Sequence, residues 1–280
     1  MTQPTQITDT AALARNRARA ARQGFVDFLH REAATEVQER CAMVNKTFTS
    51  PALVTGHPAF WGTVLPDAQI VPDTEVLPLE PDAHDLVVHA LALHWANDPV
   101  GQIIQCRRAL RPDGMFIAVL FGGETLADLR TSLAAAEIAL TGGLSPRILP
   151  MGDVRDLGAL LQRAGLALPV ADVERRKVQY DSPLHLLRDL RGMGEGNALA
   201  ARHKRPAHRE LFTEMAARYT AEHANADGKI TATFDLAVLT GWAQSEDQPK
   251  PLRPGSAQVK LAEALGTEEV GLGDAAPQRN

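Results

Sequence analysis

Two continuous apolar runs dominate the pattern of hydrophobic and polar positions along the chain. They span residues 85–93 (DLVVHALAL) and 115–121 (MFIAVLF), and turn-forming residues flank each of them. Strands that are buried on both faces of a parallel sheet have this pattern, because neither of their faces meets water. We therefore predict that the two runs are adjacent, parallel, central strands.

The segment between the two runs predicts a crossover helix. Apolar residues recur at helical spacing over residues 98–110, with Asp98 placed to cap the first turn and Pro99 suited to it. The sequence Arg-Pro-Asp-Gly at residues 111–114 predicts the turn that ends this helix. Residues 85–121 thus predict one right-handed βαβ unit.

The rest of the pattern alternates further strands with helices. Alternation of this kind is typical of an α/β protein with a parallel sheet. The N-terminal part, with an arginine-rich stretch at residues 15–22, predicts one long amphipathic helical region, whose basic face is either solvated or closes over a ligand or an acidic partner. The remaining predicted strands are 51–56, 69–72, 173–180 and 231–242, and the remaining helices are 57–65, 124–140, 153–164, 184–191 and 208–223.

This pattern also predicts how the chain is organised into domains. Residues 1–48 form an N-terminal helical region, and residues 49–265 form one domain. A helical insertion occupies about residues 181–225 of that domain, and the acidic, Gly-rich end of the chain, residues 266–280, forms a flexible tail.

Composition narrows the class of protein. The 280 residues carry a net charge of −5 and only 5% aromatic residues, which disfavours a nucleic-acid partner. No apolar run reaches the roughly 18 to 20 residues that span a membrane, and the N-terminus lacks the apolar core of a secretory signal. The only two cysteines, Cys41 and Cys106, suit a reducing compartment. We expect a cytoplasmic protein.

Polar residues follow the two buried runs, at the edge of the sheet where open α/β folds bind ligands. His94, Trp95 and Asn97 follow the first run, and Glu124 follows the second. His89, in the middle of a run, reads as a core histidine. The sequence contains no G-x-G-x-x-G, P-loop, G-x-S-x-G or H-E-x-x-H motif and no metal-ligand spacing. The residues alone therefore predict an α/β protein with an open-sheet cleft and no metal.

Motifs distributed over residues 12–265 resemble those of class I S-adenosylmethionine (SAM) methyltransferases. The resemblance is greatest to the biotin-synthesis methyltransferase-like group, which includes a mitochondrial complex I assembly factor reported as an arginine hydroxylase. It implies a Rossmann-like sheet that is shortened near its first strands and ends in an antiparallel strand. The motifs are DLVV (85–88), ALHW (92–95), NDP (97–99), RRALRPDG (107–114), ETL (124–126), LR (129–130), GLSPR (143–147), DLRGMGE (189–195) with Asn197, GW (241–242) and RPGS (253–256).

One segment departs from the family pattern. The family's first strand ends in a D-x-G-x-G-like loop that approaches the methionine part of SAM. This chain has LVTGHP at residues 53–58, so Gly56 remains, Thr55 replaces the acid, and Pro58 removes a backbone donor. Weak SAM binding, or its loss, would follow.

The next acidic loop, residues 73–79, leaves two alternatives open. It resembles the family's adenine-bracketing D-x-E-x-L-P-F, which would mean that the unit carrying the ribose acid is deleted. Alternatively, residues 70–71 are the second strand, Asp73 serves the ribose, and the adenine strand is missing. A crossover needs about a dozen residues, so both cannot fit.

The resemblance implies a SAM-dependent enzyme that methylates a small acid or a protein side chain. The alternatives are a non-catalytic assembly or binding factor with a methyltransferase fold, and a protein-arginine hydroxylase. No catalytic residue is identified. Trp242, Arg253 and Ser256 are expected far from the cofactor, with the Pro-rich segment 248–256 packed over the insertion. The candidate cofactor-binding residues are Gly56, Asp73, Glu75, His94 and Trp95.

Overall fold

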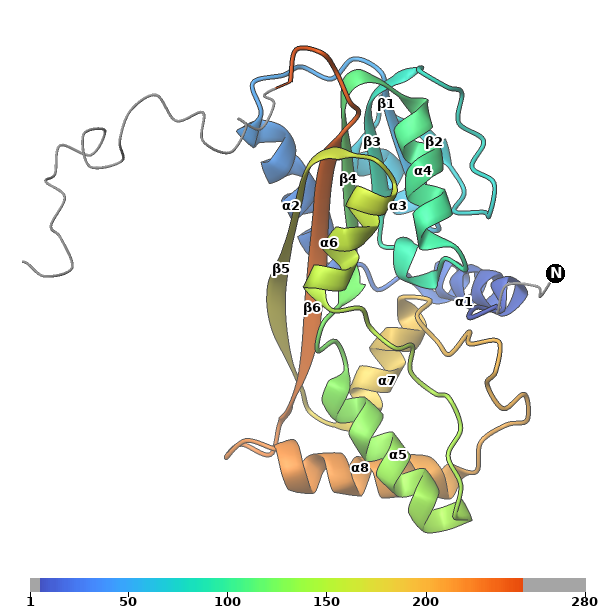
Figure 1. The fold of residues 1–280 in the computed structure, drawn as a ribbon. Helices are drawn as coiled ribbons and strands as arrows, with labels where there is room; N and C mark the ends of the chain where they lie inside the picture. The colour runs from blue at the N-terminus through green and yellow to red at the C-terminus, as the bar shows by residue number, and fades with distance from the viewer. Residues whose placement is uncertain (1–5, 249–280) are drawn as a thin grey trace, which may run out of the picture. The chain divides into compact units, whose positions relative to one another are not determined.

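The computed structural model describes residues 6–248, which form one six-stranded sheet with helices on both faces (Figure 1). The strand order is β2-β1-β3-β4-β6-β5. Every neighbouring pair from β2 to β4 is parallel, and β6 runs antiparallel to both of its neighbours. The strands are β1 (Pro51–Thr55), β2 (Gln69–Val71), β3 (His84–Ala90), β4 (Leu110–Gly122), β5 (Ala167–Tyr180) and β6 (Ile230–Trp242).

The predicted central pair is confirmed. β3 and β4 are parallel neighbours, with Val88 opposite Ile117 in the register. All seven positions of β3 are buried, as are Met115 to Gly122 of β4. The α4 helix connects them, and the Asp98 side chain caps its first turn by accepting a hydrogen bond from the Gly101 amide at 2.8 Å.

The helices divide between the two faces of the sheet. Leu29 of α2 and Trp61 of α3 belong to the core on one face, and Ile103 of α4 and Leu161 of α6 belong to the core on the other. Each core forms because one apolar stripe of a helix packs on a buried sheet face. The helices are α1 (Thr10–Gln23), α2 (Phe28–Met43), α3 (Pro58–Val64), α4 (Pro99–Ala109), α5 (Ala127–Thr141), α6 (Val154–Arg163), α7 (Pro183–Gly192) and α8 (Arg209–His223).

The insertion lies beyond the carboxyl ends of the parallel strands. It contains α7 and α8 between β5 and β6, and α8 packs against α5 (Figure 1). The first helix, α1, crosses the same edge of the sheet and contacts α7. The antiparallel direction of β6 puts its last residue, Trp242, opposite Met115 in the amino-terminal half of β4, away from the edge where the parallel strands end.

Two local predictions are wrong. The N-terminal region is not one long helix, because α1 and α2 are separated at Gly24, whose φ of 102° belongs to a region that favours glycine. Residues 111–114 do not leave the sheet, because β4 already begins at Leu110, opposite His84, and the turn is absorbed inside the strand with Asp113 at a φ of 60°. Both differences leave the topology unchanged.

The structure also decides how many strands lie outside β1. Within residues 6–248, β2 is the single strand on that side, and it is parallel to β1 with Leu53 opposite Ile70. The segment carrying Asp73 thus follows a strand that neighbours β1 directly, and there is one such unit rather than two. Across the same described residues, no helix is long and apolar enough to cross a membrane.

Candidate functional site

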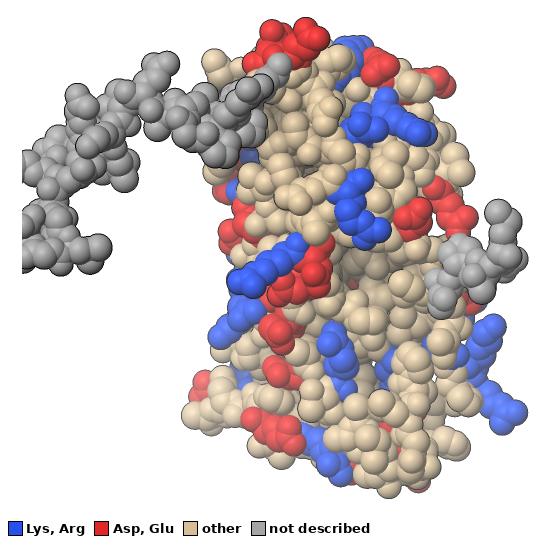
Figure 2. All heavy atoms as spheres, viewed as in Figure 1, with Lys and Arg blue, Asp and Glu red and all other residues tan. Residues whose placement is uncertain are grey.

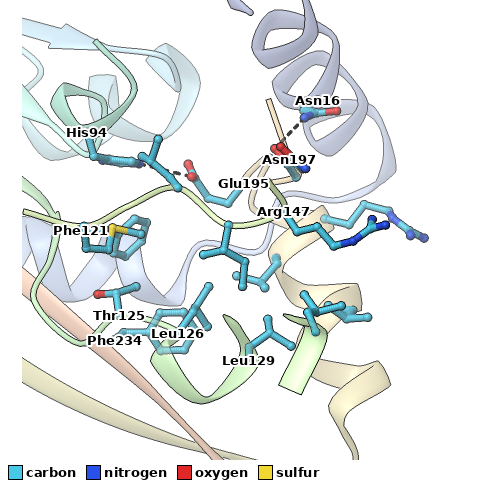
Figure 3. Close-up of a pocket in the computed structure, with 18 of the residues that line it drawn as sticks. Asn16, His94, Phe121, Thr125, Leu126, Leu129, Arg147, Glu195, Asn197 and Phe234 are labelled. Carbon is cyan, nitrogen blue, oxygen red and sulfur yellow. Dashed lines mark hydrogen bonds and ion pairs between the residues drawn. The ribbon is translucent and has the colours of Figure 1, made fainter. Parts of the chain in front are cut away.

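Two cavities open at the edge of the sheet where the parallel strands end. The larger, of about 1170 Å³, lies between α1 and the segments that follow β1 and β2. The smaller, of about 320 Å³, lies between the end of β4, α5 and α7 (Figure 3). Trp95 lines both cavities, so its indole forms part of the wall between them.

The predicted candidate residues divide between these cavities. Gly56, Asp73 and Glu75 line the larger one together with Trp95, whereas His94 lines the smaller one. Their common position follows from topology, because the carboxyl ends of parallel strands meet at one edge. The expected role of these residues in cofactor binding stays a prediction.

A buried ion pair joins α1 to the loop after β2. Arg17 Nη1 donates to both carboxylate oxygens of Asp73, at 2.8 and 2.9 Å, and the two side chains are only 10% and 14% exposed. The same guanidinium lies directly over Gly56, so that a Cβ atom on this residue would overlap it. One arginine therefore covers both Gly56 and Asp73, the two positions at which this chain matches the family pattern, and no local sequence signal indicates this pairing.

The N-terminal segment is fastened in this position by polar contacts. The Asn97 side chain accepts hydrogen bonds from the amides of Ile7 and Thr8 at 2.9 and 2.8 Å. Asn16 of α1 donates to the carbonyl of Gly196 at 2.9 Å, in the loop after α7. Thus Asn97, which was predicted at the mouth of the cleft, binds the backbone of the segment before α1. The α1 helix in turn links the edge of the larger cavity to the insertion.

Glu195 is a buried acid that sequence reasoning quoted in a motif but gave no role. Its Oε2 accepts hydrogen bonds from Trp95 Nε1 at 2.7 Å and from His94 Nε2 at 3.3 Å, as the dashed line in Figure 3 indicates for His94. Burial by itself raises the pKa of this carboxyl, but the bond with His94, the Arg17 charge and Trp95 outweigh it and lower the pKa to about 2. Glu195 is therefore ionised at neutral pH.

A cluster of aromatic and imidazole rings lies beside Gly56. His57 stacks on Phe25 with ring centroids 4.5 Å apart, and His30 accepts a hydrogen bond from Trp61 Nε1 at 3.0 Å. Burial, followed by the Arg17 charge, lowers the pKa of His57 to about 4. Burial likewise lowers the pKa of His30 to about 3, so both rings are neutral at pH 7. His89, as predicted, is a core residue, bonded to Gln102 at 2.9 Å.

The smaller cavity combines an apolar wall with a basic rim. Phe121, Leu129 and Phe234 form part of the wall, and Arg147 and Arg191 contribute guanidinium groups, to which α1 adds Arg19. Arg147 is held by an ion pair with Glu137 of α5. The arrangement suits a ligand with an apolar body and an anionic end.

Charge elsewhere is mixed, and no metal-ligand cluster is present in the described part of the chain. Figure 2 shows acidic and basic side chains interspersed over the face that carries α4 and α6, among the described residues. Within residues 6–248, no group of three or more His, Cys, Asp or Glu could hold a metal ion. Trp242 lies at the opposite edge from both cavities, as predicted. Arg253, Ser256 and nearly all of the Pro-rich segment lie outside the described residues.

Comparisons with known proteins give a matching domain family and several similar chains. A methyltransferase domain model matches residues 56–118. The chain is 40% identical over 208 residues, 74% of its length, to mitochondrial arginine-hydroxylase NDUFAF5 of Mus musculus, and spans 60% of that protein. It is 32% identical over 188 residues, 67% of its length, to the malonyl-[acyl-carrier protein] O-methyltransferase of Laribacter hongkongensis, and spans 61% of it. A solved structure, the YcgJ protein of Bacillus subtilis, is similar with a TM-score of 0.48 at 12% identity, over 76% of this chain and 98% of that one.

Proposed function

This chain carries a methyltransferase domain in a class I methyltransferase fold, and we propose that it binds SAM in the larger cavity and methylates an acceptor in the smaller one. The observation that carries the proposal is the pair of cavities at the carboxyl edge of the sheet, separated by the side chain of Trp95. Direct transfer needs the acceptor atom within about 3 to 3.5 Å of the methyl carbon, so the indole would have to lie beside the line of transfer and not across it.

The residues of the larger cavity fit the cofactor. Gly56 lets another group lie close against the backbone, as the Arg17 guanidinium does, and the carboxylate of Asp73 follows the strand next to β1. Each Asp73 oxygen keeps a lone pair besides the one that Arg17 uses, so a hydroxyl can share the carboxylate. The cavity is large enough for a ligand of this size.

The chain's own contribution to methyl transfer is alignment and the exclusion of water. When bound, SAM would supply the methyl group of its positively charged sulfur. The bond from that carbon to sulfur would break as a lone pair of the acceptor atom bonds to the carbon. Trp95, at the wall between the cavities, and Phe121, in the wall of the smaller one, would restrict the access of water. Holding the two reactants in place lowers the entropic cost of their encounter. Catalysis of this kind does not require an acid–base pair.

We assign an acidic acceptor to the smaller cavity. Arg19, Arg147 and Arg191 would bind a carboxylate, and the leucine and phenylalanine wall would hold an apolar chain behind it. The relative from Laribacter hongkongensis is named for methylating malonyl-acyl carrier protein, which supports an acid. The chain spans about 60% of the length of these two relatives, so the exact acceptor of either relative is not assigned to it.

Calorimetric titration with SAM and with its demethylated product, S-adenosylhomocysteine, tests the proposal. We expect dissociation constants of tens to hundreds of micromolar, about −5 to −6 kcal/mol, because the first loop lacks the second glycine and Pro58 lacks an amide donor. The absence of binding at millimolar SAM would overturn it.

A second candidate is a non-catalytic binding or assembly protein. The Arg17–Asp73 pair favours this second candidate, because the arginine side chain fills the space over Gly56. In a methyltransferase, part of the cofactor would approach that glycine. Arginine hydroxylation, the activity in the name of the mouse relative, is a third outcome. Mass spectrometry of incubated acceptors separates the three, as a gain of one methylene, no gain, or a gain of one oxygen.

A further inference from the structure

Several buried polar atoms on side chains that line one or the other cavity have no hydrogen-bond partner among residues 6–248. They are Nε and Nη2 of Arg17, Nε2 of His57 and Oε1 of Glu195. The Arg17 and Glu195 side chains are 10% and 7% exposed. Unpaired polar groups in such places are costly, more so when they are charged, so each unpaired atom calls for a partner.

These atoms belong to side chains that converge. A Cβ atom on Gly194 would lie 3.1 Å from Arg17 Cα and 3.4 Å from His57 Cε1. Glu195 is the next residue after Gly194, and the Arg17 guanidinium lies over Gly56, which precedes His57. The loop after α7, the helix α1 and the loop after β1 therefore come together here, and the charges of Arg17 and Glu195 both act on the pKa of His57.

The chemistry of the unpaired atoms is complementary to two opposite charges. Arg17 uses only Nη1 on Asp73, so its Nε and Nη2 remain as parallel donors, which is the side of a guanidinium that matches a carboxylate. Glu195 uses only Oε2, so Oε1 remains as an acceptor for a cation. Among the described residues, no ion pair joins Arg17 to Glu195 directly.

We propose that Arg17 and Glu195 form a receptor for the α-amino acid end of a ligand, with the carboxylate on Arg17 and the ammonium group on Glu195. His57, neutral and unpaired at Nε2, completes its wall. This inference rests on the proposed function, because SAM ends in an α-amino acid. It assigns to α1 and to the insertion, rather than to the shortened first loop, the binding of that end.

Glu195 would also connect the two cavities. The same carboxylate accepts from Trp95, which lines both cavities, and from His94, which lines the smaller one. An ammonium group bound to Oε1 would therefore hold the Glu195 carboxylate in place, and this carboxylate orients the side chains of His94 and Trp95. Occupation of the larger cavity would thus order one wall of the smaller cavity.

The test compares S-adenosylhomocysteine with 5′-methylthioadenosine, which keeps the nucleoside and the thioether but lacks the amino acid. On the natural protein, we expect S-adenosylhomocysteine to bind about tenfold tighter or more by calorimetry. Glu195→Gln should remove about tenfold of the affinity for S-adenosylhomocysteine and leave that of 5′-methylthioadenosine unchanged. Arg17→Met also frees Asp73, so it should weaken binding of both compounds, and that of S-adenosylhomocysteine by about tenfold more. Arg15→Met, on an exposed position of α1, and Glu210→Gln, on α8, are the matched controls and should change neither affinity.

Each outcome is decisive. Equal affinity of the natural protein for the two compounds, or variants that bind S-adenosylhomocysteine as tightly as the natural protein does, would overturn the receptor while leaving the proposed function intact. If neither compound binds the natural protein, the proposed function fails and the receptor fails with it. Where a variant does not fold, the natural protein is titrated with S-adenosylhomocysteine analogues lacking the amino or the carboxyl group, and each should bind about tenfold more weakly.

Discussion

The β3–β4 centre of the sheet and the edge where α1 meets β1 and β2 are built in opposite ways. The centre is apolar at successive positions, from Leu86 to Ala90 and from Met115 to Phe121. The edge is formed by a three-residue strand, a buried ion pair and charged atoms without partners. Burial of apolar side chains in the centre stabilises the fold, whereas the edge keeps charged atoms that no other described residue binds.

The largest expected effect tests the centre. Val88→Asp places a charge at a fully buried position opposite Leu53 and Ile117, where no cation can pair with it. An unpaired buried charge costs several kcal/mol, so the variant should not fold. Urea unfolding followed by circular dichroism measures this. Val76→Asp, at a position that is 77% exposed, is the control and should unfold like the natural protein. A soluble Val88→Asp protein with a cooperative transition would contradict the assignment.

The next effect tests the ion pair that holds Arg147 at the smaller cavity, away from both the apolar centre and the α1 edge. Burial raises the pKa of Glu137, but hydrogen bonds from Arg147 and Ser145 outweigh it and lower the pKa to about 2, from an ordinary 4.5. A lowered pKa means that this carboxylate stabilises the fold above about pH 4.5 and that the contribution disappears as the pH falls through 2. Glu137→Gln should thus unfold more easily at pH 7, by at most about 3 kcal/mol, and equally at pH 2. A deficit that does not change with pH would show that the charge is not responsible.

A smaller effect concerns ligand binding rather than folding. Asp73→Ala removes the carboxylate that pairs with Arg17 just after the end of β2. Loss of a charge-assisted hydrogen bond should weaken SAM binding by about 1 to 3 kcal/mol in calorimetry. Micromolar binding that is insensitive both to this change and to Gly56→Val would place the ligand elsewhere.

The smallest change is expected in thermal stability, when an exposed Arg–Asp ion pair is removed and the result is compared with removal of the buried Arg17–Asp73 pair. Arg31 and Asp27 pair at 2.7 Å on α2, with Arg31 70% exposed, whereas Arg17 and Asp73 are nearly buried. Water screens the exposed pair, so Arg31→Ala should leave the thermal midpoint almost unchanged, while Arg17→Met lowers it. Equal shifts in the two variants would mean that burial of the Arg17 pair contributes nothing to stability.

These contrasts explain how far the sequence could predict the fold. β3, β4 and α4 follow from runs and caps that are local in the chain, and Asp153 caps α6 by accepting from the Arg155 amide in the same way. The break between α1 and α2 was missed because the apolar pattern continues through it, while Gly24 alone carries the signal.

The candidate site was predictable only in part. Gly56, Asp73, Glu75 and Trp95 come together because each follows a parallel strand. The partner of Asp73 lies 56 positions away, and Glu195 lies 100 positions from Trp95. No local periodicity encodes such pairs, since packing of α1 and the insertion on the sheet creates them. The domain boundaries stay a prediction.

The direction of β6 has a practical consequence for spectroscopy. The chain has three tryptophans: Trp95 lines both cavities, Trp61 packs on Phe60 with ring centroids 5.6 Å apart, and Trp242 lies at the far edge of the sheet beside Lys46. Replacing Trp242 with Phe would leave the emission of Trp95, at the cavities, and that of Trp61, which is fully buried and lines neither of them. Ligand titrations could then be followed by the protein's own emission, without a label.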